Sequence, residues 1–385
     1  MLLRTLLLAL IAWLALPAHA NSTWKVTLLE WDDNPALHHK RLERAYLGHP
    51  GGSAADGIRL AFEEAKFALD AAKLKLVLNI QPVRSLAQAR DAALKAQASG
   101  ARILLSTLPG AWTLAAVDAV KLPVINLSDG ADRLREGDCR SMLFHALPSD
   151  RMRADAIAQA LAQRRWQRVL LLSGSGPGDA DRTLAAQSAI RRYGLKLSAH
   201  KPFKLSADPR ERAQANPRLL SAGQDYDIVW VVDSDGEFAR TLPYNTASAR
   251  PVVGDAGWVA LAWHGSFERF GAPQLVRRFI KSVKRPMTNH DWAAWIAGKT
   301  VAAAAASGAP TPAALSRALL DLQFDGSKGV ALSFRPWDGQ LRQPLLLTDG
   351  QGVLTTLPVD GVLHPSNALD TLGADAPQRL CKARS

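Results

Sequence analysis

Two rounds of alternating strand and helix patterns constrain this chain more than any other feature of its sequence. Short aliphatic runs, such as Ile103–Ser106 and Val169–Ser173, alternate with longer segments whose apolar residues recur at helical spacing. Nearly pure aliphatic strands are typical of parallel sheets that helices cover on both faces. The pattern restarts near Leu143, so the sequence predicts two successive α/β units of about 120 residues each.

The segments after the second unit predict a chain that crosses between two lobes several times. Helical patterns at Pro273–Val283 and Asp291–Ser307 follow that unit, and hairpin-like strands occupy Leu322–Leu347. We therefore expect an α/β fold of two Rossmann-like lobes joined by a multi-strand hinge. The expected ranges are 21–142 plus about 268–341 for lobe one, 143–267 plus about 342–385 for lobe two, and Leu143–Ser149, Ala262–Phe267 and Arg342–Leu347 for the hinge.

The first twenty residues have the features of a cleavable export signal. Arg4 supplies a positive charge, Leu6–Leu16 is an unbroken apolar run, and Ala18-His19-Ala20 has the small-x-small pattern that signal peptidase recognises. The apolar run is too short to span a bilayer comfortably, although an N-terminal membrane anchor stays the alternative. We expect residues 1–20 to be a signal peptide, cleavage after Ala20, and a mature protein in the periplasm.

The net charge of +12 does not by itself indicate a nucleic-acid partner. The basic residues are scattered, as in Arg164-Arg165 and Arg277-Arg278, and they fall on the polar faces of predicted helices. An exported protein also meets little nucleic acid. We therefore expect no nucleic-acid partner.

The two cysteines, Cys139 and Cys381, are candidates for a structural disulfide. An oxidising compartment outside the cytoplasm would keep paired thiols oxidised. Their spacing excludes a Cys-x-x-Cys redox centre and a zinc knuckle, and neither residue lies in a motif that activates a thiol. The sequence favours the Cys139–Cys381 disulfide, with a nucleophilic cysteine as the alternative.

Four segments, taken in order, resemble the periplasmic type I substrate-binding proteins of ABC transporters, the group that includes branched-chain amino acid binding proteins. They are Gly51–Ala65, Phe144–Asp150, Asp291–Ala297, and Phe324–Val330 with Phe334. The resemblance covers nearly the whole chain after residue 20. It implies that a small ligand is captured in a cleft between two lobes and delivered to an ABC transporter permease in the inner membrane.

Finer details are similar to the binding proteins encoded alongside pyrroloquinoline-quinone-dependent (PQQ-dependent) alcohol oxidation. They are Trp263-His264 with Glu268–Leu275, then Arg335–Pro344, and Leu369–Gly373 ahead of Cys381. This resemblance implies an association with that metabolism. The fold implied by the resemblance to the type I substrate-binding proteins has a C-terminus that returns close to the hinge, which would bring Cys381 near Cys139.

Polar residues follow several predicted strands at their carboxyl ends, where ligands bind in open α/β sheets. The predicted ligand-binding residues are Ser106, Thr107, Ser128 and Asp129 in lobe one and Ser175, Asp233 and Asp255 in lobe two, with Asp32 and Asp33 at the rim. The many carboxylates favour a cationic, metal-bearing or polyhydroxylated ligand. The alternative is that individual Asp and Ser residues cap helices or form Asx turns.

The predicted site departs from the amino-acid binders that the chain resembles. Those proteins hold the ligand's carboxylate with hydroxyl groups and backbone amides after the third and fourth strands of lobe one. Here Asp129, in the matching stretch Asn126–Ala131, would repel a carboxylate. The second lobe has Ser173–Asp179 where those relatives offer an aromatic residue. The resemblance therefore does not carry the amino-acid pocket over as a set.

The sequence contains no motif that indicates an enzyme. Asp233–Glu237 fails the spacing of a calcium loop, and Gly174–Gly178 lacks the glycine order and the lysine of nucleotide-binding loops. Neither a Gly-x-Ser-x-Gly nor a His-Glu-x-x-His motif is present. We expect a binding protein with no cofactor and no resident metal. The alternative is a periplasmic accessory or sensor protein of a quinoprotein alcohol dehydrogenase system, with metal handling as a variant.

Overall fold

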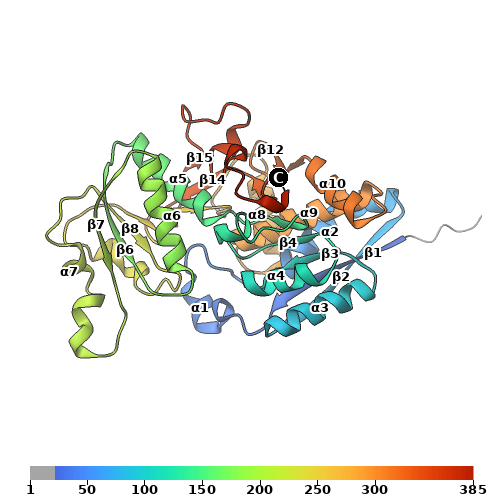
Figure 1. Ribbon diagram of the computed structural model, residues 1–385, viewed down its shortest axis with the longest axis horizontal. Coiled ribbons are helices and arrows are strands. Elements are labelled where there is room, and N and C mark those ends of the chain that lie inside the picture. The colour runs from blue at the N-terminus through green and yellow to red at the C-terminus, as the bar shows by residue number, and fades with distance from the viewer. Residues whose placement is uncertain (1–21, 385) are drawn as a thin grey trace, which may run out of the picture.

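The computed structural model of the chain describes residues 22–384. Two lobes lie side by side along the long axis of the molecule (Figure 1). Each lobe is built on its own parallel sheet, as the two rounds of strand and helix patterns predict. The signal peptide predicted for residues 1–20 lies outside the described residues.

The first sheet contains five parallel strands in the order β2-β1-β3-β4-β5. They are β1 (Ser22–Trp31), β2 (Leu74–Val83), β3 (Ala101–Ser106), β4 (Val124–Asn126) and β5 (Leu143–His145). The sequence analysis places Leu143 at the start of lobe two, whereas the structure pairs β5 with β4 of the first sheet. Its residues are buried because Gln340 bridges to His145 and covers the outer edge of the strand. The other lobe boundaries stay predictions.

Helices cover both faces of the first sheet. On one face lie α2 (Ala55–Ala71), α8 (Ala272–Val283) and α9 (Asn289–Ala306), and on the other lie α3 (Leu86–Ala98) and α4 (Gly110–Ala119). Ile103 of β3 packs into the first layer and Leu104 into the second, because successive strand residues point to opposite faces. Helices α2 and α9 come very close at Gly298, where an added Cβ would lie 2.7 Å from that of Ala61.

The second sheet contains four parallel strands in the order β7-β6-β8-β9. They are β6 (Arg168–Ser173), β7 (Lys196–Pro202), β8 (Ile228–Val232) and β9 (Val252–Gly254), and α5 (Asp150–Gln163) and α6 (Asp179–Arg192) pack on one face. The segment after β8 forms the 3₁₀ helix η4 (Ala239–Tyr244). It contains Pro243, which lacks the N–H that a longer α-helix would need there.

The chain after the second sheet adds two small antiparallel sheets. One consists of β10 (Val259–Leu261), β14 (Leu345–Thr348) and β15 (Val353–Leu357), and the other of β11 (Phe324–Asp325), β12 (Ala331–Phe334) and β13 (Leu341–Arg342). The sequence analysis names no element at β10, β15, α1 (His39–Arg44), α7 (Pro217–Ser221) or α10 (Pro312–Asp321). Among the described residues, no helix is both long and apolar enough to span a bilayer.

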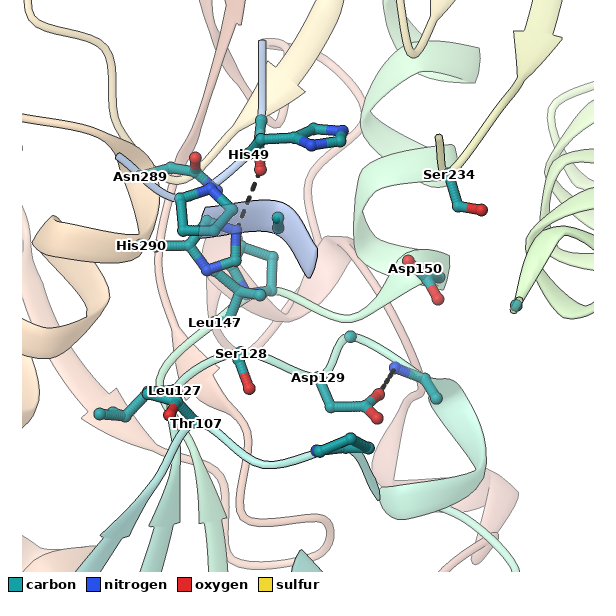
Figure 2. A pocket seen from close by; sticks show the side chains of 18 of the residues that line it. His49, Thr107, Leu127, Ser128, Asp129, Leu147, Asp150, Ser234, Asn289 and His290 are labelled. Atoms are coloured by element: carbon teal, nitrogen blue, oxygen red, sulfur yellow. Dashed lines mark hydrogen bonds between the residues drawn. The ribbon is translucent and has the colours of Figure 1, made fainter. Parts of the chain in front are cut away.

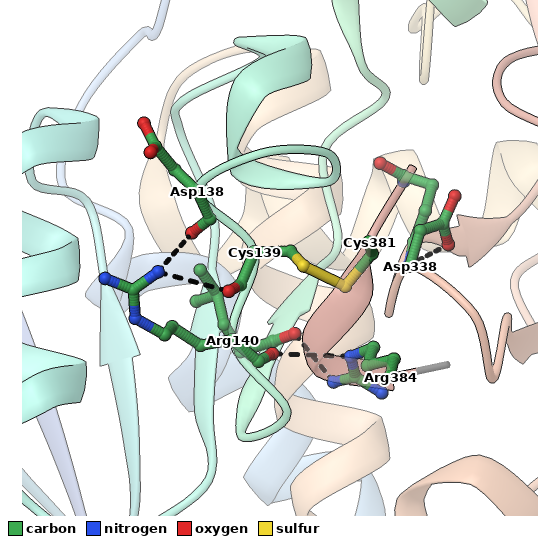
Figure 3. Close-up of a disulfide and its surroundings, with 8 residues drawn as sticks. Asp138, Cys139, Arg140, Asp338, Cys381 and Arg384 are labelled. Carbon is green, nitrogen blue, oxygen red and sulfur yellow. Dashed lines mark hydrogen bonds between the residues drawn. A yellow bond between two sulfur atoms is a disulfide. The ribbon is translucent and has the colours of Figure 1, made fainter. Parts of the chain in front are cut away.

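The C-terminal tail returns to the junction between the lobes. Cys381 forms a disulfide with Cys139, 242 residues earlier in the chain (Figure 3). Arg384 donates a hydrogen bond to the carbonyl oxygen of Leu143 over 2.8 Å, and its guanidinium lies 4.5 Å from the ring centre of Phe144. The structure thus contains the disulfide that the sequence predicts, and it fastens the tail beside β5.

Candidate functional site

A cleft of about 600 Å³ lies between the lobes, at the carboxyl ends of the parallel strands. Loops after β1, β3 and β4 form its lobe-one wall, and α5, α6 and the loops after β8 and β9 form its lobe-two wall. A second cavity of about 640 Å³ is lined by β15 and the loop 266–269, and by no residue that follows a parallel strand. The first cavity is therefore the candidate site.

Three of the predicted lobe-one residues line the cleft. Thr107 follows β3, and Ser128 and Asp129 follow β4 (Figure 2). The carboxylate of Asp129 accepts hydrogen bonds from the N–H of Gly110, the first residue of α4, over 2.6 Å, and from the N–H of Ala131 over 2.8 Å. Asp129 therefore caps a helix and faces the cleft, which combines both roles considered for it.

Two predicted serines do not line the cleft. Ser106 is fully buried, and its hydroxyl lies 2.9 Å from a threonine hydroxyl of α4. Because neighbouring residues of an extended chain point to opposite sides, Thr107 reaches the cleft and Ser106 does not. Ser175 is exposed, and Pro177 and Gly178 of the same loop line the cleft in its place.

The aspartates predicted at the rim also lie outside the lining. The carboxylate of Asp32 is 2.7 Å from Nε of Arg84, and that of Asp33 is 3.6 Å from the same atom. Arg84 follows β2, which lies beside β1 in the sheet. The two carboxylates therefore face a neighbouring guanidinium rather than the cleft.

The lobe-two aspartates both line the cleft. Asp233 follows β8, and its Oδ2 accepts from the N–H groups of Phe238 and Ala239 over 3.0 and 2.9 Å. Burial raises the pKa of Asp233. Asp255 follows β9, and its Oδ2 accepts from the N–H of Asp233 over 2.7 Å. The loops after the two neighbouring strands are thus held together by their own carboxylates.

Two arginines that the sequence analysis missed offset the negative charge of the carboxylates in the lobe-two wall. Arg182 forms an ion pair with Asp255, and Nη2 of Arg153 lies 3.3 Å from Oδ1 of the same residue. Asp150 lies 3.7 Å from Arg182 and 3.9 Å from Arg153. Burial alone would raise the pKa of Asp255, but the two guanidiniums outweigh it and hold this pKa below its usual value. The two positive charges of Arg153 and Arg182 thus balance the two negative charges of Asp150 and Asp255 within the wall.

Two histidines, His49 and His290, close one end of the cleft (Figure 2). Nε2 of His290 lies 3.0 Å from the carbonyl oxygen of Gly48 and donates to it, so Nδ1 of the neutral ring is an acceptor. Burial lowers the pKa of both residues, and the pKa of His49 falls to about 4. The cleft therefore presents neutral imidazoles at pH 7. The sequence signal that could have located them is their position, since His290 is the second residue of α9 and His49 lies in the loop before α2.

The composition of the cleft suits reversible binding of a small molecule. It combines hydroxyl, carboxylate and imidazole acceptors with an apolar part that includes Trp31, Leu127 and Leu261. Within residues 22–384, no group of three His, Cys, Asp or Glu side chains is placed to hold a metal ion.

Replacing Asp132 with asparagine should make the free energy of unfolding less dependent on pH, because it removes a buried carboxyl group that titrates. Burial, followed by the nearby Asp150 carboxylate, raises the pKa of Asp132 to about 7. A raised carboxyl pKa contributes stability that is complete below the unfolded value of 3.8 and is lost as the pH rises towards 7. The introduced asparagine could still accept from the N–H of Arg151 but could not ionise.

We expect Asp132→Asn to gain stability relative to wild type between pH 4 and 8, by on the order of 2 kcal/mol at pH 8. Urea unfolding curves across that range measure the difference. Parallel stability profiles for the two proteins would contradict the expectation.

Several solved structures are similar to this chain over most of its length. The sequence matches no known family profile and no curated protein. A periplasmic binding protein from Burkholderia mallei has a TM-score of 0.70 at 13% identity, covering 95% of this chain and 100% of its own. The leucine-, isoleucine-, valine-, threonine- and alanine-binding protein of Brucella ovis, in its closed conformation, also has a TM-score of 0.70 at 13% identity, covering 87% of this chain and 95% of its own.

A third structure is the solute-binding protein of an R. palustris ABC transporter in complex with benzoate. Its TM-score is 0.65 at 14% identity, and the match covers 87% of this chain and 96% of that protein. The matched proteins are thus similar over almost their whole length. The chain has the two-lobed α/β fold of the type I periplasmic binding proteins of ABC transporters.

Proposed function

We propose that this chain is the periplasmic solute-binding component of an ABC transporter. It would capture a small ligand between its lobes and present it to an inner-membrane permease. The observation that carries the proposal is the cleft of about 600 Å³, whose two walls come from different lobes. Ligand pockets of this size bury most of the surface of a small molecule, so closure of the lobes would enclose it.

Contacts across the mouth of the cleft are of a kind that can open and close. The segment that contains α1 reaches from lobe one to the loop 233–237 of lobe two, where Arg41 pairs with Asp235 and Arg44 with Glu237. The hydroxyl of Tyr46 donates to Glu237 over 2.5 Å. Partly exposed ion pairs contribute only about 0–1 kcal/mol each, so opening the cleft would cost little.

Ligand-dependent stabilisation tests the proposal. The protein is stripped of any ligand by unfolding and refolding, and its melting temperature is measured with panels of amines, carboxylates, alcohols, sugars and metal ions. A ligand at a hundred times its Kd should stabilise the folded state by about 2.7 kcal/mol. No shift with any class, in a protein that has refolded, would contradict the proposal.

A variant that fills the cleft supplies the control. Ser128→Trp places an indole against the lobe-one wall and should abolish the ligand-induced shift. The matched control is Ser248→Trp, which adds the same side chain at an exposed position of lobe two and should leave the shift intact. Equal shifts in both variants would place the ligand outside the cleft.

The partner and the metabolic context belong to the same proposal. The resemblance to proteins encoded alongside PQQ-dependent alcohol oxidation supports a link to that metabolism, and it rests on sequence similarity alone. Cross-linking in intact cells should capture a permease of the inner membrane. Capture of a quinoprotein dehydrogenase in place of a permease would favour the accessory function and contradict transport.

A further inference from the structure

Several backbone N–H groups of the lobe-one wall of the cleft already donate to side chains of the same wall. Asn126 Oδ1 accepts from the N–H groups of Ser128 and Asp129 over 3.2 and 3.0 Å. Asp129 accepts from Gly110 over 2.6 Å, and Ser106 Oγ accepts from Leu108 over 3.2 Å. These amides would otherwise be the natural donors to an anion at a helix start. The N–H groups of Ser128, Asp129 and Gly110 are thus taken by side chains of the wall, and the Asp129 carboxylate occupies the place at the start of α4 where an anionic ligand group would have to lie.

The polar atoms that remain on this wall are mainly acceptors. Thr107 Oγ1 lies 3.4 Å from the carbonyl oxygen of Leu29, its acceptor, and Ser128 Oγ lies 3.5 Å from that of Leu108. Thr107 Oγ1 also accepts from the N–H of Trp31 over 3.1 Å. Because a hydroxyl oxygen has two lone pairs, each hydroxyl can direct its hydrogen into the protein and still offer one lone pair to the cleft. Nδ1 of His290 is an acceptor as well, and no group in the described part of the chain donates to it.

The charge of the cleft has the opposite sign from that of the whole chain. Among the described residues that line it, seven are carboxylates and three are guanidiniums, whereas the chain carries a net charge of +12. The guanidiniums are also engaged, because Arg153 and Arg182 pair with Asp255, and Arg133 lies 2.7 Å from Asp138. A ligand carboxylate would therefore meet acceptors and negative charge, whereas a cation with N–H groups would meet complementary partners.

We infer that the ligand is a small organic ammonium compound whose N–H groups face Thr107, Ser128, Asp129 and His290. Its carbon skeleton lies against Trp31, Leu127 and Leu261. This inference rests on the proposed function and names the ligand class of that site. It reverses the polarity of the benzoate complex described above, in which the ligand is a carboxylate.

Matched ligand pairs test the inference. Isothermal titration of the stripped protein compares benzylamine with benzoate, isoamylamine with isovalerate, and propylamine with propionate, so that only the headgroup changes. We expect at least one amine to bind tenfold or more tightly than its carboxylate partner. Carboxylates that bind as tightly as the amines, or binding confined to sugars or alcohols, would overturn the ligand class and leave the solute-binding function standing. Absence of binding by every class would overturn both.

A charge-only substitution separates binding from helix capping. Asp129→Asn keeps the size and one acceptor of the cap, and it removes the negative charge from the wall. We expect the preference for amine over carboxylate to fall at least tenfold, while Asp118→Asn, at an exposed ion pair with Arg140 on the far part of α4, leaves it unchanged. A purely structural role of Asp129 would weaken both ligands equally, and an unchanged preference would overturn the inference.

Discussion

Replacing Asp370 with alanine is expected to lower the free energy of unfolding by about 3–5 kcal/mol. Asp370 Oδ1 lies 2.8 Å from Nε of Arg335 and 2.8 Å from Nε of Arg342. The side chain of Arg335 is 0% exposed and that of Asp370 is 4% exposed, so the substitution would leave a buried guanidinium with only the more distant Asp338, 3.7 Å from its Nη1, as counter-charge. Removing one partner of a buried pair is far more costly than removing both.

Urea unfolding of Asp370→Ala and of two companions measures the effect. Arg335→Met with Asp370→Leu removes both buried charges with side chains of similar size and should recover much of the loss. Asp118→Ala breaks an exposed pair with Arg140 and should cost about 0–1 kcal/mol. A loss for Asp370→Ala no larger than that for Asp118→Ala would show that the pair contributes little.

The parallel lobes were predictable because burial on two faces leaves a strong local signal. Strands such as Val169–Ser173 consist almost wholly of aliphatic residues, and the helices between them have regular apolar spacing. Helix α1 has no such signal, since none of its residues is buried. Its position depends on ion pairs with Asp235 and Glu237, which lie nearly 200 residues away. A sequence pattern cannot reveal a helix whose main contacts are distant and polar.

The sequence could predict which loops form the candidate site, but it could not predict which side chains of those loops face the cleft. The rule that ligands bind at strand carboxyl ends located the turns after β3, β4, β8 and β9. It could not decide between adjacent residues, and only Thr107 of the pair Ser106-Thr107 reaches the cleft. It also overlooked Arg153 and Arg182, which look like ordinary polar residues of a helix. Each lies in the first turn of a helix that begins at the cleft, and this position was the available signal.

Loss of the Cys139–Cys381 disulfide is the second change with a large expected effect. The bond closes a loop of 242 residues, and the chain-entropy relation assigns such a loop about 5.5 kcal/mol as an upper value. Native disulfides typically contribute about 2–4 kcal/mol, which is the loss expected for the double variant Cys139→Ser with Cys381→Ser. Urea unfolding with and without a reductant measures it, because the reductant should destabilise wild type and leave the double variant unchanged.

The disulfide and the Asp370 ion pairs hold the same tail, so their effects should be coupled. In the disulfide-bonded Asp370→Ala variant, the disulfide still keeps the tail near the hinge although Arg335 has lost this partner. We therefore expect Asp370→Ala to cost more in the serine double variant than in the disulfide-bonded protein, whereas independent sites would give additive losses. Additive losses would mean that each fastening acts on its own part of the tail. An unchanged unfolding midpoint on reduction would contradict a structural role for the disulfide altogether.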